Sequence, residues 1–180
     1  AAGAMERGEF ARSDSLHRIA LGIWEAADPE SPDVLASLIA TALSVQGLAR
    51  YAEAESLYHR ALEIASTLYG DAHPQYAHAL NNLGRLLTDQ ARFAEADSIL
   101  RRALEVRLAA FGPEHPEVAI TRNNLGRVLR QRGRHEEAVP LYLQALAVFE
   151  ERLGPEHAYT SGTRNNLAMC YDLMGRHDLA

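Results

Sequence analysis

The sequence repeats with a period of 42 residues, and this repetition restricts the possible folds more than any other feature. Three consecutive blocks of equal length, residues 51–92, 93–134 and 135–176, follow one another without a gap. Equivalent positions match in phase, as in the three Asn-Asn pairs that end at residues 82, 124 and 166. A fixed period of roughly 20–50 residues is typical of solenoids, in which one short unit stacks on its copies.

Each block contains two amphipathic helical patterns separated by residues that form turns. In the middle block the first stripe has helical spacing and comprises Phe93, Ala96, Leu100, Ala103 and Leu104. We expect this helix to end at Gly112, in the left-handed conformation that glycine adopts easily. Pro113 follows, and the second helix is predicted to begin near Pro116 and to run to Gly133. Pro140 is expected in the first turn of the next helix.

These residues resemble the tetratricopeptide repeat, in the 42-residue form of kinesin light chains and many bacterial proteins. The family's N-L-G motif is matched by Asn82-Leu83-Gly84 and by Asn124-Leu125-Gly126, and partly by Asn166-Leu167-Ala168. The aromatic-x-E-A motif is matched at residues 93–96, and Leu-Gly-Pro-Glu-His at 153–157 resembles the linker of the long form. The resemblance implies an all-α, right-handed α-solenoid of stacked antiparallel helix hairpins with about eight helices. Arg122 and Arg164 depart from the bulky residue that Leu80 supplies, and we expect them to pack or pair locally.

The repeat phase also predicts how the rest of the chain is organised. We expect one array over residues 1–180, in which residues 9–50 form a degenerate repeat with helices at 10–27 and 32–46. Residues 1–8 are predicted to be the tail of a preceding helix, and residues 177–180 to begin a further repeat. Because both predictions place an incomplete repeat at an end of the chain, they favour the interpretation that it is a segment of a larger bacterial protein.

Composition excludes several classes of function. The formal net charge is −6 and all 18 basic residues are arginine, which argues against sequence-independent binding to nucleic acid. No apolar stretch approaches the roughly 20 residues of a membrane span, and no signal peptide is visible, so we expect a cytoplasmic protein. The single Cys170 can form neither an internal disulfide nor a zinc knuckle, and we expect it in the core.

No residue pattern predicts catalysis, a metal or a cofactor. The chain has no G-x-S-x-G, no phosphate-binding loop and no H-E-x-x-H. His73, His115 and His157 recur once per block, so we expect each ring to be bonded locally in its turn. An enzymatic activity would then belong to flanking domains of a longer protein.

The candidate binding residues are polar residues that recur on the N-L-G helices. The family resemblance implies that these helices line a concave groove, where the second Asn of each pair contacts the backbone of a peptide. Arginines one turn further along favour an acidic ligand, because guanidinium groups pair with carboxylates. The predicted peptide-binding residues are His78, Asn81, Asn82, Arg85, Asn123, Asn124, Arg127, Arg130, Asn165 and Asn166. In the alternative interpretation, the asparagines tie adjacent helices together and the arginines pair with glutamates of the neighbouring hairpin.

The sequence therefore predicts a protein-interaction module that binds a protein or peptide segment of acidic character. Its alternative is a structural spacer or self-association segment, with end-to-end contacts, in a larger multidomain signalling protein. Neither hypothesis involves nucleic acid or a membrane.

Overall fold

The structure is a computed structural model that describes residues 2–176, with side chains described from Arg7 onward. This part of the chain is all α-helical. Its helices are α1 (Ala2–Ala27), α2 (Pro32–Gly47), α3 (Tyr51–Tyr69), α4 (Pro74–Asp89), α5 (Phe93–Phe111), α6 (Pro116–Gln131), α7 (His135–Leu153) and α8 (Ala158–Leu173). Eight helices in this order confirm the predicted fold class. Residues 177–180, where a further repeat was predicted, lie outside the described residues.

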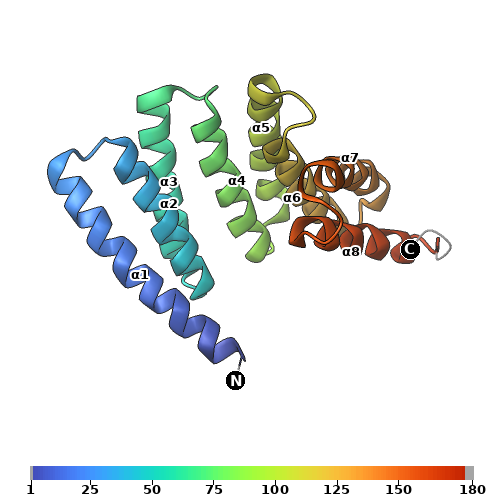
Figure 1. The fold of residues 1–180 in the computed structure, drawn as a ribbon, viewed down its shortest axis with the longest axis horizontal. Coiled ribbons are helices and arrows are strands. Elements are labelled where there is room, and N and C mark those ends of the chain that lie inside the picture. Colours follow the sequence, from blue (N-terminus) through green and yellow to red (C-terminus); the bar gives the residue numbers. More distant parts are fainter. Residues whose placement is uncertain (1, 177–180) are drawn as a thin grey trace. The chain divides into compact units, whose positions relative to one another are not determined.

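The helices form two compact units, the first ending at Gln90 and the second beginning at Ala91. In the first unit α1, α2, α3 and α4 pack in sequence, and α2 also contacts α4 (Figure 1). Ion pairs of Arg18 with Glu53 and of Arg60 with Glu25 join α1 to α3. One layer of this unit is therefore formed by α2 and α4, and the other by α1 and α3. Its core includes the fully buried Val34, Leu38, Tyr58 and Leu86.

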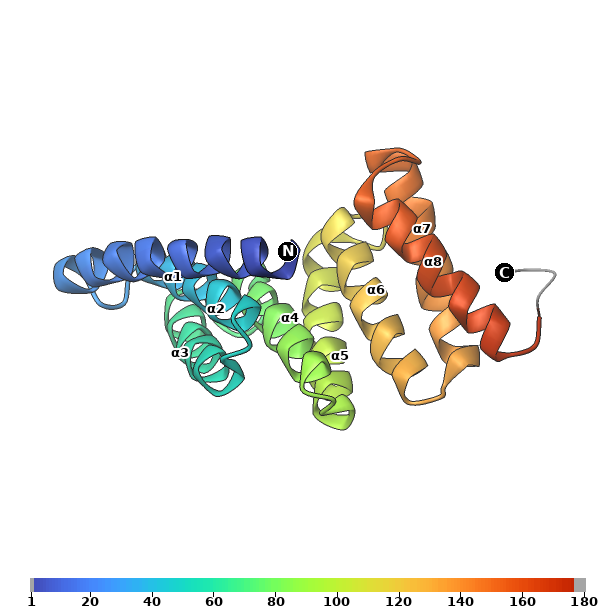
Figure 2. The same cartoon turned by 90° about the horizontal axis from the view of Figure 1, so that it is seen from below.

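The second unit repeats this arrangement with α5 to α8. Sequential helices pack together, and α6 contacts both α7 and α8 (Figure 2). A buried cluster of Ala119, Ala145, Val148 and Phe149 joins α6 to α7. Asp97 of α5 pairs with Arg132, at 2.7 Å, at the start of the turn between α6 and α7. Buried apolar contacts between neighbouring helices thus stabilise each unit, as expected for a repeat protein.

Local sequence explains where the helices begin. Pro32, Pro74 and Pro116 occupy first-turn positions, where the missing N–H would have no helical partner. His73 precedes α4, and its Nδ1 accepts a hydrogen bond from the backbone N–H of Gln75 at 3.2 Å. His115 and His157 cap α6 and α8 in the same way. The predicted local role of these three histidines is confirmed.

Glycine follows α3, α5 and α7 in a conformation that other residues rarely adopt. Gly70, Gly112 and Gly154 follow α3, α5 and α7 with φ of 82°, 77° and 86° and ψ of 161°, 170° and 166°. This combination of a positive φ with an extended ψ is essentially restricted to glycine. The expectation of a positive φ at Gly112 is confirmed, but the conformation is extended rather than left-handed helical.

Two local predictions were wrong. The structure has one continuous helix from Ala2 to Ala27, so the residues before Phe10 extend α1 and do not end a separate helix. The predicted end of that separate helix, at residue 8, is a glycine without the positive φ of 74° that Gly133 adopts after α6. Pro140 lies inside α7, beyond its first turn. A proline there leaves the carbonyl four residues earlier without its helical donor.

Candidate functional site

In the first unit the predicted binding residues share one face of α4. His78, Asn82 and Arg85 are spaced four and three residues apart, which places them on one helical stripe. Asn81 and Asn82 are only 4% and 5% exposed, whereas His78 and Arg85 are half-buried. The Asn82 side chain donates a hydrogen bond to the carbonyl of His78 at 3.1 Å. The accessible polar groups of this face are therefore mainly His78 and Arg85.

Arg85 lies near a buried polar group at the end of α2. The Tyr58 hydroxyl donates to Gln46 Oε1 at 3.3 Å, and Gln46 Nε2 donates to Asp89 at 2.6 Å. Burial raises the pKa of Tyr58, and the positive charge of Arg85 opposes that rise. The positive charge of Arg85 therefore acts on the polar group that Tyr58, Gln46 and Asp89 form.

In the second unit the corresponding asparagines connect two helices. Asn123 Oδ1 of α6 accepts a hydrogen bond from Thr163 Oγ1 at 3.2 Å and a longer one from Asn166 Nδ2 at 3.5 Å, both on α8. Asn165 is exposed and contacts Met169 of its own helix. For Asn123 and Asn166 the structure therefore contains the link between helices that the alternative interpretation predicted. An amide has further donors and acceptors, so this link leaves part of its bonding capacity unused.

Two arginines of α6 lie near a buried tyrosine of α7. Tyr142 is fully buried, and burial raises its pKa to about 12, while Arg130 and Arg127 oppose the rise. Among the described residues, Arg130 Nε and Tyr142 Oη are buried without a hydrogen bond of ordinary geometry, and Arg130 lies close enough to Tyr142 to lower its pKa. Cys170 of α8 is buried, as predicted, and burial raises the pKa of its thiol. This part of the second unit therefore places positive charge beside buried polar atoms of α6 and α7.

The two arginines that depart from the family pattern pair locally, as predicted. Arg122 donates to the carbonyl of Pro113 at 2.6 Å, and Arg164 donates to the carbonyl of Pro155 at 3.3 Å. Arg164 also pairs with Glu150 at 2.6 Å. Both side chains hold the linker that precedes their own helix.

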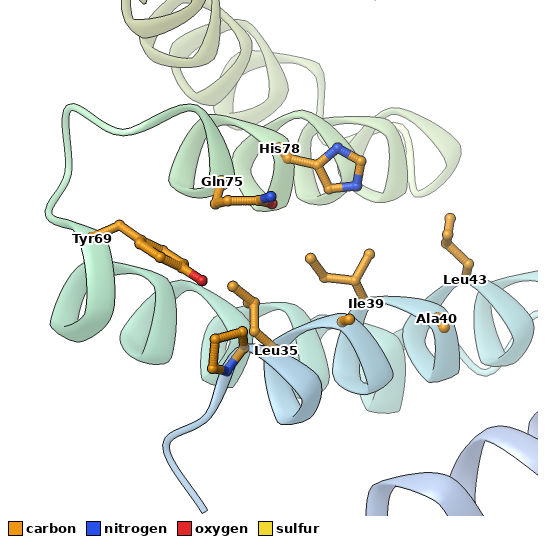
Figure 3. A pocket seen from close by; sticks show the side chains of 9 residues that line it. Leu35, Ile39, Ala40, Leu43, Tyr69, Gln75 and His78 are labelled. Atoms are coloured by element: carbon orange, nitrogen blue, oxygen red, sulfur yellow. The ribbon is translucent and has the colours of Figure 1, made fainter. Parts of the chain in front are cut away.

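Sequence reasoning missed an apolar pocket between α2 and α4 in the first unit. Its volume is about 270 Å³, and its walls include Leu35, Ile39, Leu43, Tyr69 and His78 (Figure 3). Comparing α2 with α4 at a spacing of 42 residues would have shown the apolar residues that line it, although not the pocket itself. That comparison places Ala36, Ile39, Ala40 and Leu43 where α4 has His78, Asn81, Asn82 and Arg85.

The described residues contain no cluster of three or more histidine, cysteine, aspartate or glutamate side chains able to hold a metal ion. None of the helices between residues 2 and 176 is both long and apolar enough to cross a membrane.

Solved structures with the same fold include several repeat proteins. One is a protein of Podosopora anserina with nearly identical TPR-like repeats, whose description refers to a kinesin light chain; it is 22% identical, with 98% of this chain and 85% of that chain covered and a TM-score of 0.76. BtubC (BKLC) of P. vanneervenii is 23% identical, with 98% and 70% covered and a TM-score of 0.79. Rap protein in complex with Competence and Sporulation Factor is 17% identical, with 97% and 50% covered and a TM-score of 0.75. At these identities the likeness concerns the fold alone.

Comparison with curated proteins found no match. The family model described as tetratricopeptide repeat, in contrast, matches residues 42–109, 86–151 and 117–180. These overlapping matches cover most of the chain and include all three blocks of 42 residues. The chain therefore belongs to the tetratricopeptide repeat family.

Proposed function

We propose that this chain is a protein-interaction module that binds an acidic peptide or protein segment on its N-L-G helices. Tetratricopeptide repeat domains are generally interaction modules and are typically non-catalytic, and the Rap protein of the same fold is described in complex with Competence and Sporulation Factor. We propose no catalytic role and no cofactor for the present chain. The proposed partner is a segment rich in carboxylates.

The observation that supports this proposal is the recurrence of arginine one turn after asparagine. Arg85 follows Asn82 on α4, and Arg127 follows Asn124 on α6, so each unit has its own pair. Arginine offers five N–H donors in a planar fork that matches a carboxylate, and asparagine can pair with peptide amides of any sequence. Although the whole chain is negative, these faces would attract acidic ligands.

In the second unit, two arginines of α6 support the same proposal. The positive charges of Arg130 and Arg127 both act on Tyr142, so the two cations lie near each other on α6. A ligand carboxylate placed beside α6 would gain from both charges.

The test is charge reversal combined with peptide binding. Acidic and neutral peptides are titrated into the chain by calorimetry, which avoids amine coupling of a chain without lysine. Arg85→Glu combined with Arg127→Glu should weaken binding of acidic peptides at least tenfold. A double variant of equal charge, Arg12→Glu with Arg152→Glu, changes two exposed arginines away from these faces and should leave the affinity unchanged. Equal affinity of the wild type and the Arg85/Arg127 variant would refute the proposal.

A second candidate function is self-association within a larger multidomain signalling protein, for which the chain would be a spacer. The observation that favours it is an apolar stripe on α1, where Leu16, Ile19 and Ile23 are 59%, 62% and 60% exposed. Contact with a second copy of the chain would remove this area from water. Light scattering should then reveal concentration-dependent oligomers that Ile19→Glu abolishes, and a monomer at all concentrations would exclude this function.

A further inference from the structure

The pocket of the first unit has an apolar floor and a partly polar rim. Leu35 and Ile39 of α2 are 3% and 7% exposed, and Leu43 extends the apolar wall along the same helix. Tyr69, at the end of α3, and His78, on α4, lie at the opposite side (Figure 3). A dry cavity of about 150 Å³ holds one benzene molecule, so about 270 Å³ is ample for one leucine, methionine or phenylalanine side chain.

The equivalent surface of the second unit is polar. Positions 84 residues after Ile39 and Leu43 are Asn123 and Arg127 on α6. There Asn123 bonds to Thr163 and Asn166 of α8, so polar side chains link α6 to α8 where the first unit has apolar ones. The two units therefore differ in the ligand chemistry that they can accept at matching positions.

Arg85 supplies a positive charge further along α4 from the rim of the pocket. His78 at its rim and Arg85 lie on the same stripe of α4, seven residues apart, which corresponds to about 10 Å along a helix axis. An extended peptide advances about 3.3 Å per residue. Three residues of an extended ligand therefore span the distance along α4 from His78, at the rim of the pocket, to the position of Arg85.

We propose that the α2–α4 pocket binds one bulky apolar side chain of the acidic ligand, while Arg85 binds a carboxylate three residues away. This inference rests on the proposed function, and it specifies the ligand further by fixing its register. Arginine positions alone would allow an acidic segment to slide along the helices. A single apolar side chain in the pocket makes one register more favourable than the others, because only that register buries it.

The experiment compares two peptides that differ at one position. The first contains Asp-Ala-Ala-Leu-Ala-Ala-Asp, which offers a carboxylate three residues from the leucine in either chain direction, and the second replaces leucine by serine. Removal of a leucine side chain from water should make the first peptide bind roughly 10- to 100-fold more tightly to the wild-type chain. A third peptide, with leucine moved next to one aspartate, should bind more weakly than the first.

A variant that fills the pocket provides the second measurement. Ala40 lines the pocket, and the matching position of α6 is Asn124, so a larger side chain is compatible with this helix. Ala40→Leu should lower the affinity for the leucine peptide to that for the serine peptide, without changing the latter. Ala52→Leu, at an exposed position of α3, is the control and should have no effect.

The outcomes separate this inference from the proposed function. If both peptides bind equally, with an affinity that Arg85→Glu lowers, the pocket does not accept the ligand and only this inference fails. If neither peptide binds at millimolar concentration, both the inference and the proposed function are refuted. Tighter binding of the leucine peptide that Ala40→Leu abolishes supports both.

Discussion

Replacing Glu117 by Gln should destabilise the second unit more than removing its arginine partner. Arg107 of α5 is only 2% exposed and is held by three contacts with α6. Its guanidinium lies 2.5 Å from the Glu117 carboxylate, donates to the Glu117 carbonyl at 3.0 Å and donates to Thr121 Oγ1 at 2.7 Å. Burial lowers the pKa of Arg107, while the Glu117 charge opposes this. The carboxylate thus offsets part of the cost of a buried cation.

The expected magnitudes follow from the exposure of the two partners. Leaving a buried cation without its counter-ion costs about 3–5 kcal/mol. Because the Glu117 side chain is 37% exposed, water reaches this pair and we expect about 2–3 kcal/mol for Glu117→Gln. Arg107→Met removes the charge and keeps an unbranched apolar stem, while Glu117 can be hydrated. We therefore expect a cost of about 1 kcal/mol or less for Arg107→Met.

Urea denaturation followed by far-UV circular dichroism measures both variants. The control is Glu105→Gln on α5, the helix of Arg107. The Glu105 side chain is 69% exposed and pairs with Arg102, so its loss should cost less than about 1 kcal/mol. A larger loss for Arg107→Met than for Glu117→Gln would refute the reasoning, because the arginine would then stabilise the unit through packing rather than depend on its counter-ion.

Three further predictions concern backbone conformation and titration. Ala49→Gly should raise the free energy of unfolding by about 0.5–1 kcal/mol in urea denaturation, because Ala49 has φ of 59° where the last two repeats have Gly133 and Gly175. Cys170 should react with a thiol reagent at pH 8 at least tenfold more slowly in the native chain than in urea, because burial limits access and raises its pKa. Burial raises the pKa of Tyr142 to about 12, above about 10 in the unfolded chain, so the folded state keeps a proton that the unfolded state releases, and stability falls as pH rises between these values. Between pH 8 and pH 11, the free energy of unfolding measured in urea should therefore fall by about 1 kcal/mol less for Tyr142→Phe than for the wild type.

Most of the fold could be predicted from the repeat because the residues that recur in it determine local structure. Proline in a first turn and glycine after a helix limit the backbone directly, so the start of α6 at Pro116 and the end of α5 before Gly112 were predicted correctly. The predicted end of a helix at residue 8 was wrong, because no turn follows Gly8 and α1 continues through it.

The candidate site was less predictable because it depends on contacts between helices. Sequence spacing placed His78, Asn82 and Arg85 on one stripe, but it did not show that Asn82 is almost covered and bonds to its own helix. The pocket requires α2 and α4 to lie side by side, which is a tertiary property. The link from Asn123 to Asn166 also connects residues 43 positions apart, and sequence reasoning could only name it as an alternative.

The most direct test of the proposed function is the salt dependence of binding an acidic peptide. The affinity of the wild-type chain is measured by calorimetry at low and moderate salt, beside a neutral peptide of the same length. We predict that only the acidic peptide binds, that its affinity falls as salt screens the charges, and that Arg85→Glu with Arg127→Glu abolishes the difference. Equal, salt-independent binding of both peptides, unaffected by charge reversal, would contradict recognition of an acidic segment by these arginines.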